Sequence, residues 1–225
     1  MRQVAVCRIA RCVECSGSGT SILSTSGDWR CRHSQKGCMK YLEREFFARD
    51  TLTVARDLIG TTLVIGRCEG RIVETEAYTT DLASHSVIRR NQASIMRETF
   101  GHVYVYFIYG MYYCLNFTAD RHGPGAVLIR AAEPIRGIEL MRRRREQSEI
   151  RRLASGPGRL CQAFAIDLMV NGSPIGRKIR LRERTHCPEV STSRRIGISR
   201  AAELEWRFFE TGNPFVSQHR RHSAE

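Results

Sequence analysis

The chain has 225 residues and a formal net charge of +13, with 42% hydrophobic and 26% charged residues. A chain of this length buries one sizeable core, so we expect a single domain, and its hydrophobic content excludes wholesale disorder. The excess positive charge indicates a polyanionic partner, either nucleic acid or an anionic membrane surface. The membrane is the weaker alternative, because the longest apolar run, at 103–117, is too short to span a bilayer.

The first residues bear on the location of the protein. Arg8 and Arg11 interrupt the only apolar stretch that follows Met1, so no signal peptide is predicted. We therefore expect a soluble cytoplasmic protein whose nine cysteines are mostly reduced.

Composition changes near residue 39. The segment before it holds five of the nine cysteines and a Gly/Ser/Thr stretch at 16–26, with no sustained hydrophobic periodicity. A packed domain would not begin in this way. We expect residues 1–38 to be a disordered or non-native extension with Met39 as the natural start, 39–220 to be the functional domain, and 221–225 to be a tail.

A zinc module is the alternative for this extension. One Cys-x2-Cys pair suits half of a zinc site, but the second pair is spaced more widely than is usual. The ligands would be Cys12 and Cys15 with Cys31, His33 or Cys38.

From Met39 onward, hydrophobic periodicity and turn residues predict regular elements. Because strands do not alternate regularly with helices, they favour an α+β domain with a largely antiparallel sheet. In chain order we expect a helix at 51–59, strands at 62–65 and 71–78, a hairpin of 103–109 with 112–118, a strand at 125–130, helices opening at Glu133–Pro134 and at Ser155–Pro157, and strands at 178–182, 195–199 and 206–210.

The strand at 71–78 carries two carboxylates. Side chains alternate along a strand, so Ile72, Glu74 and Glu76 are predicted to share one face. Two carboxylates so close repel each other, and either one lies at the solvent edge or a cation such as Arg130 compensates. The alternative is that both glutamates are ordinary surface residues.

Aromatic residues surround this strand in the sequence. Tyr78 follows the carboxylates, His85 lies seven residues further on, and Tyr106 lies in the next strand. Core packing is the alternative for each aromatic, and we favour it for Tyr104 and Tyr113.

The hairpin has an unusual tip, Tyr109-Gly110-Met111-Tyr112. A glycine at the first central position of a two-residue turn predicts type II′ geometry. Hairpin tips are normally polar, whereas this one presents an exposed apolar point. Such a point suits a wedge that unstacks base pairs, and an oligomer contact is the alternative.

A dense run of arginines follows the central strands. Arg142–Arg145, with Arg151 and Arg152, either contacts phosphates or forms a solvated face. The segment 155–159, at a predicted helix start, could hold a phosphate on backbone N–H groups, although helix capping explains it equally well.

These motifs resemble the alkyladenine (3-methyladenine) DNA glycosylases of the non-helix-hairpin-helix type. The resemblance runs from about Glu43 to Val216. It rests, in order, on Leu58–Gly60, Arg71–Tyr78, Ala83–His85, Tyr104–Asn116, Leu128–Pro134, Gly156–Pro157, Leu160–Ala163 and Arg195–Gly197. It implies a single mixed domain around a curved, largely antiparallel sheet with a protruding hairpin that inserts into DNA.

The resemblance also implies an activity. Alkylated purines, 3-methyladenine and 7-methylguanine among them, would be flipped out of damaged double-stranded DNA and hydrolysed off, leaving an abasic site. No metal, cofactor or lyase step is implied, and we expect a monomer located with the nucleoid if the source is bacterial. The resemblance implies that Glu76, with Arg130, activates the water. It implies that the base is bound by Tyr78, His85, Tyr106 and Asn116, and that Asn116 crowds the exocyclic amine of guanine. It also implies that the residues that intercalate into DNA are Tyr109, Met111 and Tyr112.

One segment departs from the family pattern. Residues 86–101 lack its usual Gly/Pro-rich character, which leaves the substrate range open. Two other functional classes also stay open at this stage. They are a non-catalytic nucleic-acid-binding protein on the same scaffold, and an interaction protein that uses the hairpin as a protein contact.

Overall fold

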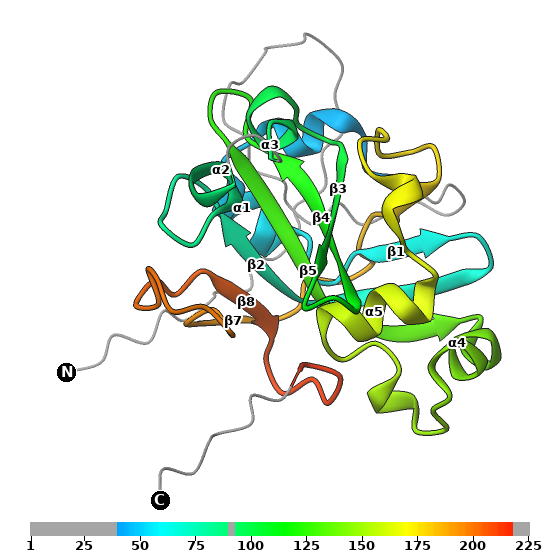
Figure 1. Cartoon of the computed structure of the whole chain (residues 1–225). Coiled ribbons are helices and arrows are strands. Elements are labelled where there is room, and N and C mark those ends of the chain that lie inside the picture. Colours follow the sequence, from blue (N-terminus) through cyan, green and yellow to red (C-terminus); the bar gives the residue numbers. More distant parts are fainter. Residues whose placement is uncertain (1–39, 90–92, 218–225) are drawn as a thin grey trace, which may run out of the picture. The chain divides into compact units, whose positions relative to one another are not determined.

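The computed structural model describes residues 40–89 and 93–217 (Figure 1). The alternatives for residues 1–38, including the zinc module, and the predicted tail fall outside the described residues, and the domain boundary at residue 39 stays a prediction. No helix within the described ranges is long and apolar enough to cross a membrane.

The described chain is an α+β domain, as predicted. The elements in chain order are η1 (Arg44–Ala48), α1 (Thr51–Asp57), β1 (Thr62–Ile65), β2 (Cys68–Tyr78), α2 (His85–Ile88), α3 (Ile95–Glu98), β3 (Val103–Ile108), β4 (Tyr112–Ala119), β5 (Gly125–Arg136), α4 (Ile138–Arg145), η2 (Ile150–Arg152), α5 (Pro157–Phe164), η3 (Leu168–Val170), β6 (Ile179–Arg182), β7 (Val190–Ser193) and β8 (Arg207–Glu210).

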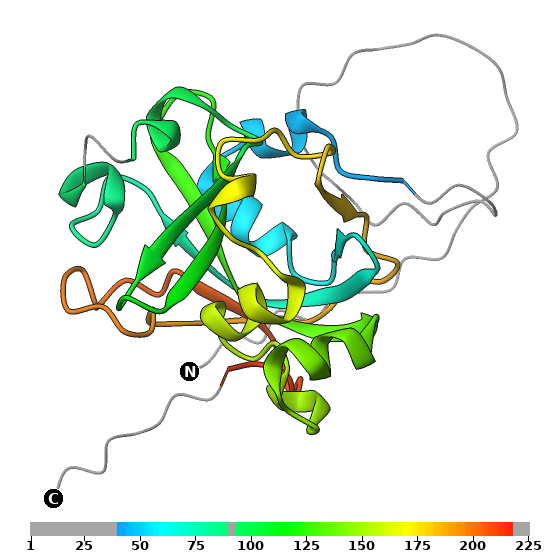
Figure 2. The ribbon, with the colours of Figure 1, turned by 45° about the vertical axis from the view of Figure 1, so that its right-hand side comes forward.

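The strands form one curled sheet in which every pairing between described strands is antiparallel (Figure 2). Its order is β3-β4-β5-β2-β1-β6, and β8 joins the sheet by pairing with β2 and β7. Strand β2 is therefore central. It pairs with β5 along one edge, and along the other edge it pairs first with β1 and then with β8.

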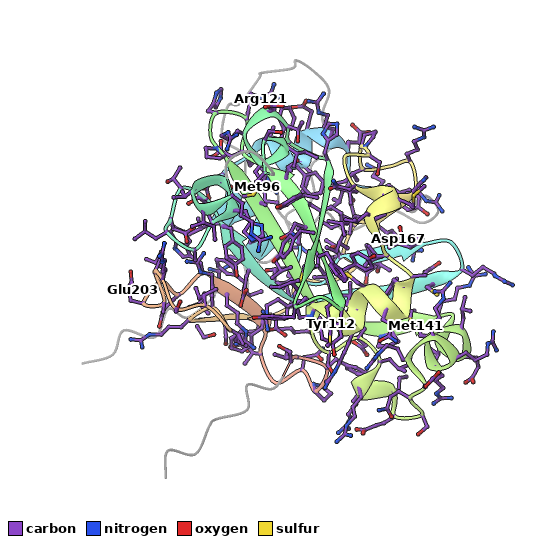
Figure 3. All side chains as sticks on the ribbon, viewed as in Figure 1. Met96, Tyr112, Arg121, Met141, Asp167 and Glu203 are labelled. Atoms are coloured by element: carbon purple, nitrogen blue, oxygen red, sulfur yellow. The ribbon has the colours of Figure 1, made fainter. Side chains whose placement is uncertain are left out.

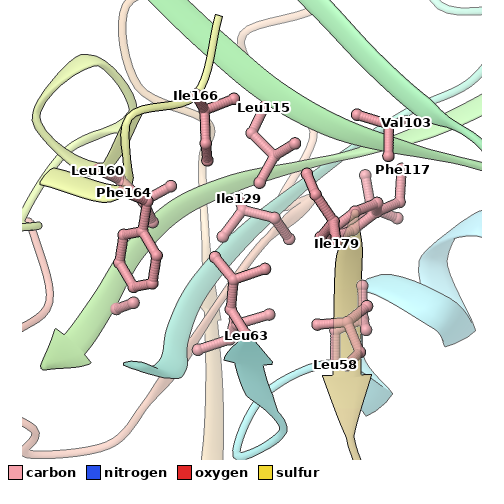
Figure 4. Packing of buried hydrophobic residues seen from close by; sticks show 14 of the residues in the cluster. Leu58, Leu63, Val103, Leu115, Phe117, Ile129, Leu160, Phe164, Ile166 and Ile179 are labelled. Carbon is pink, nitrogen blue, oxygen red and sulfur yellow. The ribbon is translucent and has the colours of Figure 1, made fainter. Parts of the chain in front are cut away.

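The hydrophobic core covers one face of the sheet (Figure 4). Helix α1 begins where the side chain of Asp50 accepts from the backbone N–H of Thr53, and it buries Val54 and Ala55 against the sheet. Each such apolar side chain contributes about 1.5–3 kcal/mol when it is fully buried. The cluster shown includes Leu58, Leu63, Val103, Leu115, Phe117, Ile129, Leu160, Phe164, Ile166 and Ile179.

Two predicted elements differ from the structure. The helix expected to open at Glu133–Pro134 is present as α4, but it begins only at Ile138, because β5 continues to Arg136 alongside the early part of β2. Proline has no N–H for a ladder, and Pro134 pairs with Gly70 next to an irregularity in the register. The strand expected at 195–199 is a loop, and the strand that pairs with β8 is β7 instead.

A bulge also changes which side chains share a face of β2. Ile72 pairs with Ala132 and Glu74 with Ala131, so β2 has one extra residue between them. Ile72 therefore lies in the core, and two neighbouring residues on the same side, Thr75 and Ala77, are also buried there. The predicted common face of Ile72 with the two carboxylates is wrong, and Glu74 and Glu76 lie on the face away from the core.

Candidate active site

The face of the sheet opposite the main core holds two buried carboxylates and one guanidinium. Glu74 and Glu76 on β2 are fully buried, and Arg130 on β5 is 7% exposed. The Nε of Arg130 lies 2.8 Å from Oε1 of Glu74, and its Nη1 lies 3.3 Å from Oε1 of Glu76. The predicted compensation of this carboxylate pair by Arg130 is confirmed.

Further donors orient the carboxylate of Glu76. The hydroxyl of Tyr78 donates to Oε2 over 2.8 Å, and the backbone N–H of Ile196 donates to Oε1 over 2.7 Å. Burial and the charge of Glu76 raise the pKa of Tyr78 well above its ordinary value, so this hydroxyl keeps its proton and donates. Burial alone would lower the pKa of Arg130, but the charges of Glu76 and Glu74 raise it, so Arg130 is a permanent cation.

Aromatic rings gather beside this carboxylate. The ring centroids of His85 and Tyr106 are 4.4 Å apart, and Nδ1 of His85 lies 2.8 Å from the hydroxyl of Tyr104. Burial, with a smaller effect of the Arg89 charge, lowers the pKa of His85 to about 4. At neutral pH the imidazole is therefore uncharged. It lies against an electron-rich ring and presents no positive charge to a base.

Tyr104 has two roles, of which the sequence interpretation gave one. It is buried against Ala93, Met96 and Ala126, which confirms the predicted core packing. Its hydroxyl also holds the ring of His85, a role that was missed. The sequence contained a signal for this role, because Tyr104 and Tyr106 lie two residues apart on one strand and so share a face. The prediction of core packing for Tyr113 is confirmed as well.

Tyr78 is half-buried and packs against the same small cluster as Tyr106. The guanidinium of Arg195 stacks over its ring at 4.6 Å from the centroid. Within the described residues Tyr78 makes no ring contact with His85 or Tyr106. One face of Tyr78 is thus occupied by a cation, and the hydroxyl is committed to Glu76.

Asn116 lies on β4, directly across the ladder from Tyr104. Its amide nitrogen donates to the backbone carbonyls of Tyr104 at 3.1 Å and Cys114 at 3.3 Å, so the amide has a fixed orientation. Cys114 shares this face, opposite Tyr106, and was missed as a lining residue. Burial raises the pKa of the Cys114 thiol to about 11, so it stays protonated.

The hairpin of β3 and β4 carries the predicted apolar tip. Tyr109 is 76% exposed and Met111 is 64% exposed. The predicted type II′ turn is wrong: Tyr109 and Gly110 both have positive φ, and Met111 donates its N–H to the carbonyl of Ile108. Positive φ at both central residues is the pattern of a type I′ turn, which fits the twist of two-stranded hairpins.

Tyr112 differs from the other tip residues because it is packed against α5 (Figure 3). A Cβ on Gly158 would lie 2.9 Å from the Tyr112 ring, so only glycine allows this contact. The first turn of α5 therefore supports the hairpin. Insertion of Tyr112 into DNA stays a prediction.

Comparisons with known proteins agree with this geometry. The family model described as "Methylpurine-DNA glycosylase (MPG)" matches residues 45–214. The chain belongs to the methylpurine-DNA glycosylase family. Membership confirms the predicted class of enzyme, a DNA repair glycosylase that acts on alkylated purines.

Several curated relatives are similar over most of their length. A protein of Agrobacterium fabrum is 46% identical over 181 residues, which cover 78% of this chain and 91% of the relative. A protein of Rhizobium etli is 47% identical over 180 residues, covering 78% and 88%. A protein of Nitrosospira multiformis is 46% identical over 178 residues, covering 76% and 91%. All three are named "Putative 3-methyladenine DNA glycosylase".

The arginine run of this methylpurine-DNA glycosylase is partly structural. Arg144 donates to the carbonyl of Ala163, and Arg145 donates to the carbonyl of Leu153 and to the side chain of Gln162. These bonds join α4 to η2 and α5. Contact of the run with phosphates stays a prediction, and these two side chains are already engaged within the protein.

Three residues of the glycosylase site were not singled out individually by the sequence analysis. Arg195 and Arg207 are buried, and Ser217 is 8% exposed although it lies near the end of the chain. Arg195 anchors the loop that brings Ile196 to Glu76, while Arg207 and Ser217 contact Glu74. Their spacing along the chain carries no local pattern, so only the tertiary structure reveals them.

Proposed function

We propose that this glycosylase removes 3-methyladenine and 7-methylguanine from duplex DNA by hydrolysis and so begins base excision repair. The observation that carries the proposal is the carboxylate of Glu76, which is fully buried beside an aromatic cluster and held by two hydrogen-bond donors and an ion pair with Arg130. The names of the relatives support 3-methyladenine as the substrate.

The chemical step needs one base and one water. A water oxygen attacks the anomeric carbon, its proton passes to Glu76, and the bond between that carbon and the base nitrogen breaks. The electron pair of this bond leaves with the base, so a cationic alkylated purine departs neutral and an abasic site remains. Oriented general bases typically contribute 10²–10⁴ in rate. Arg130, which donates a hydrogen bond to Glu74 and forms an ion pair with Glu76, would help to hold the water.

Recognition of the base follows from the aromatic cluster. Alkylated purines such as 3-methyladenine carry positive charge, and a cation between electron-rich rings gains about 1–2 kcal/mol when it is desolvated. Tyr78 would contact one face of the flipped base, and His85 with Tyr106 the other. The neutral state of His85 supports this arrangement, because a charged imidazole would repel such a base.

The exposed tip of the hairpin supports base flipping. Flipping costs a few kcal/mol, and a side chain that fills the vacated space offsets part of this cost. Tyr109 and Met111 are the exposed apolar side chains available for that insertion. The net charge of +13 would supply salt-dependent contacts with the DNA backbone.

The test is release of 3-methyladenine from methylated duplex DNA in the presence of EDTA, comparing wild type with Glu76→Gln. We expect wild type to release the base, and Glu76→Gln to lose at least about 10²-fold in rate while keeping affinity for abasic-site DNA. Glu69→Gln is the matched control. It also removes a carboxylate of β2 that is paired with an arginine, Arg182, but at the far end of the strand. Turnover retained by Glu76→Gln would contradict the mechanism.

A further inference from the structure

The last described residue of the chain binds a carboxylate next to the catalytic one. The backbone N–H of Ser217 donates to Oε2 of Glu74 over 2.7 Å, and its hydroxyl donates to Oε1 over 2.8 Å. Ser217 is 8% exposed and Glu74 is fully buried. Two bonds from one residue therefore fix the end of the described chain to the middle of the central strand.

Glu74 also accepts from two arginines. Its Oε1 lies 2.8 Å from Nε of Arg130 and 2.7 Å from Nε of Arg207. Burial alone would raise the pKa of Glu74, but the charges of Arg130 and Arg207 outweigh it and lower the pKa below the ordinary value. Glu74 is thus an anion held by donors from β5, β8 and the C-terminal segment.

Arg207 is itself held in place. Its Nη1 donates to the hydroxyl of Ser193 over 2.8 Å, and its guanidinium lies over the ring of Phe209 at 4.5 Å. Its Nη2 donates to the carbonyl of Ser217 at 3.4 Å. Arg207 and Ser217 therefore support each other as well as Glu74.

These contacts decide where Arg130 points. The guanidinium is planar and rigid, so the direction of its Nε bond to Glu74 sets the direction of the Nη1 that faces Glu76. Without a fixed Glu74, Arg130 would be free to form a bidentate pair with Glu76, which is the favoured geometry between these groups. Such a pair would occupy the carboxylate that must take the proton of water.

We propose that Ser217 and Glu74 are positioning residues of the reaction, which hold Arg130 in an ion pair with Glu76 through Nη1 alone and so keep that carboxylate available. Neither residue touches the reacting atoms. The inference rests on the proposed role of Glu76 and extends the site to the C-terminal segment.

Ser217→Ala tests the hydroxyl contact. We expect the single-turnover excision rate to fall about tenfold, the scale of one hydrogen bond to a charged group, with affinity for abasic-site DNA unchanged. Ser217→Thr, which keeps the hydroxyl, should restore the rate. Ser191→Ala is the matched control, because the hydroxyl of Ser191 on β7 contacts Thr211 and not Glu74.

Glu74→Gln tests the charge through the pH profile of excision. Removing this anion leaves Glu76 as the ionised partner of Arg130, so the acid limb of the profile should move to lower pH. The other ionisable groups near Glu76 are Tyr78, Cys114 and Arg207, of which Arg207 loses its ion pair with Glu74 in this variant.

Four outcomes overturn the inference. Three of them are a wild-type rate in Ser217→Ala, a failure of Ser217→Thr to restore the rate, and an acid limb unmoved in Glu74→Gln. The fourth is a loss of rate in Ser217→Ala that comes with a lower affinity for abasic-site DNA and a lower melting temperature. In that case the role of Ser217 is only structural. Each of these leaves the proposed function standing, provided that wild type excises and Glu76→Gln does not.

Discussion

The backbone N–H of Ile196 donates to Oε1 of Glu76 over 2.7 Å, although the two residues lie far apart in the sequence. The loop that carries Ile196 is fixed by its neighbour Arg195, whose side chain is fully buried. The guanidinium of Arg195 donates to the carbonyl of Ala77 and forms an ion pair with Asp81 at 2.8 Å. The orientation of the Glu76 carboxylate, the proposed general base, therefore depends on a buried arginine that does not touch it.

Arg195→Gln should lower both stability and excision. Removing one partner of a buried ion pair costs about 3–5 kcal/mol, because Asp81 would be left without its cation. The melting temperature should fall, and at a temperature where the variant is folded its excision rate should fall at least about tenfold. Arg194→Gln is the matched control, since this neighbouring arginine is exposed. Equal melting temperatures and rates for the two variants would contradict this prediction.

Tyr109→Ser should weaken binding and flipping together. Flipping costs a few kcal/mol, and the Tyr109 side chain would no longer be present to offset part of that cost. We therefore expect a roughly tenfold loss of affinity for duplexes containing a damaged base. The measurement is binding to a duplex with a fluorescent base analogue, which reports flipping and affinity at once. Ile135→Ser, which alters an exposed apolar side chain near the C-terminal end of β5 and outside the hairpin, should change neither. An unchanged affinity of Tyr109→Ser for these duplexes would contradict the insertion of Tyr109 into DNA.

Local patterns were sufficient to predict the hairpin, whereas the residues of the aromatic cluster came from the family resemblance. Tyr104, Tyr106, Cys114 and Asn116 lie at alternate positions of two paired strands, so the twofold period alone places them on one face. The helix predicted at 51–59 is present as α1, Thr51–Asp57. It too follows from a local pattern, because apolar residues recur at helical spacing and Asp50 caps its start.

Long-range contacts account for what was missed. The extra residue at Val73 turns Ile72 toward the core, and nothing in the β-branched run around it marks a bulge. The segment at 195–199 has strand-like composition, but the side chain of Arg195 bonds to the carbonyl of Ala77 and to Asp81, so the chain forms a loop there. Ser217 contacts Glu74 across 143 residues, a separation that no local pattern encodes.

Asn116→Ser should relax the rejection of guanine-type bases. The amide nitrogen of Asn116 is fixed by two backbone carbonyls, so the side chain has little freedom to move away from an exocyclic amine. Serine is shorter and would leave room for that amine. Excision of 7-methylguanine, which carries that amine, should therefore rise about tenfold relative to 3-methyladenine, which lacks it, measured as free bases released from methylated DNA. An unaltered product profile would remove Asn116 from discrimination.

His85 should make folding stability depend on pH in a defined window. Its pKa is lowered from 6.5 to about 4 in the folded protein, first by burial and then by the charge of Arg89. Between these two values the unfolded chain binds a proton that the folded chain does not, so stability falls as the pH falls. The contribution is complete above about pH 6.5 and is lost progressively toward pH 4.

The measurement is the melting temperature of wild type and of His85→Gln between pH 7.5 and 4.5. Glutamine does not titrate, so the melting temperature of the variant should decline less steeply below pH 6.5. The other six histidines are present in both proteins, and their effects cancel in the comparison. Parallel curves for the two proteins would show that His85 does not titrate with a lowered pKa. They would also remove the argument that the ring meets a cationic base in its neutral form.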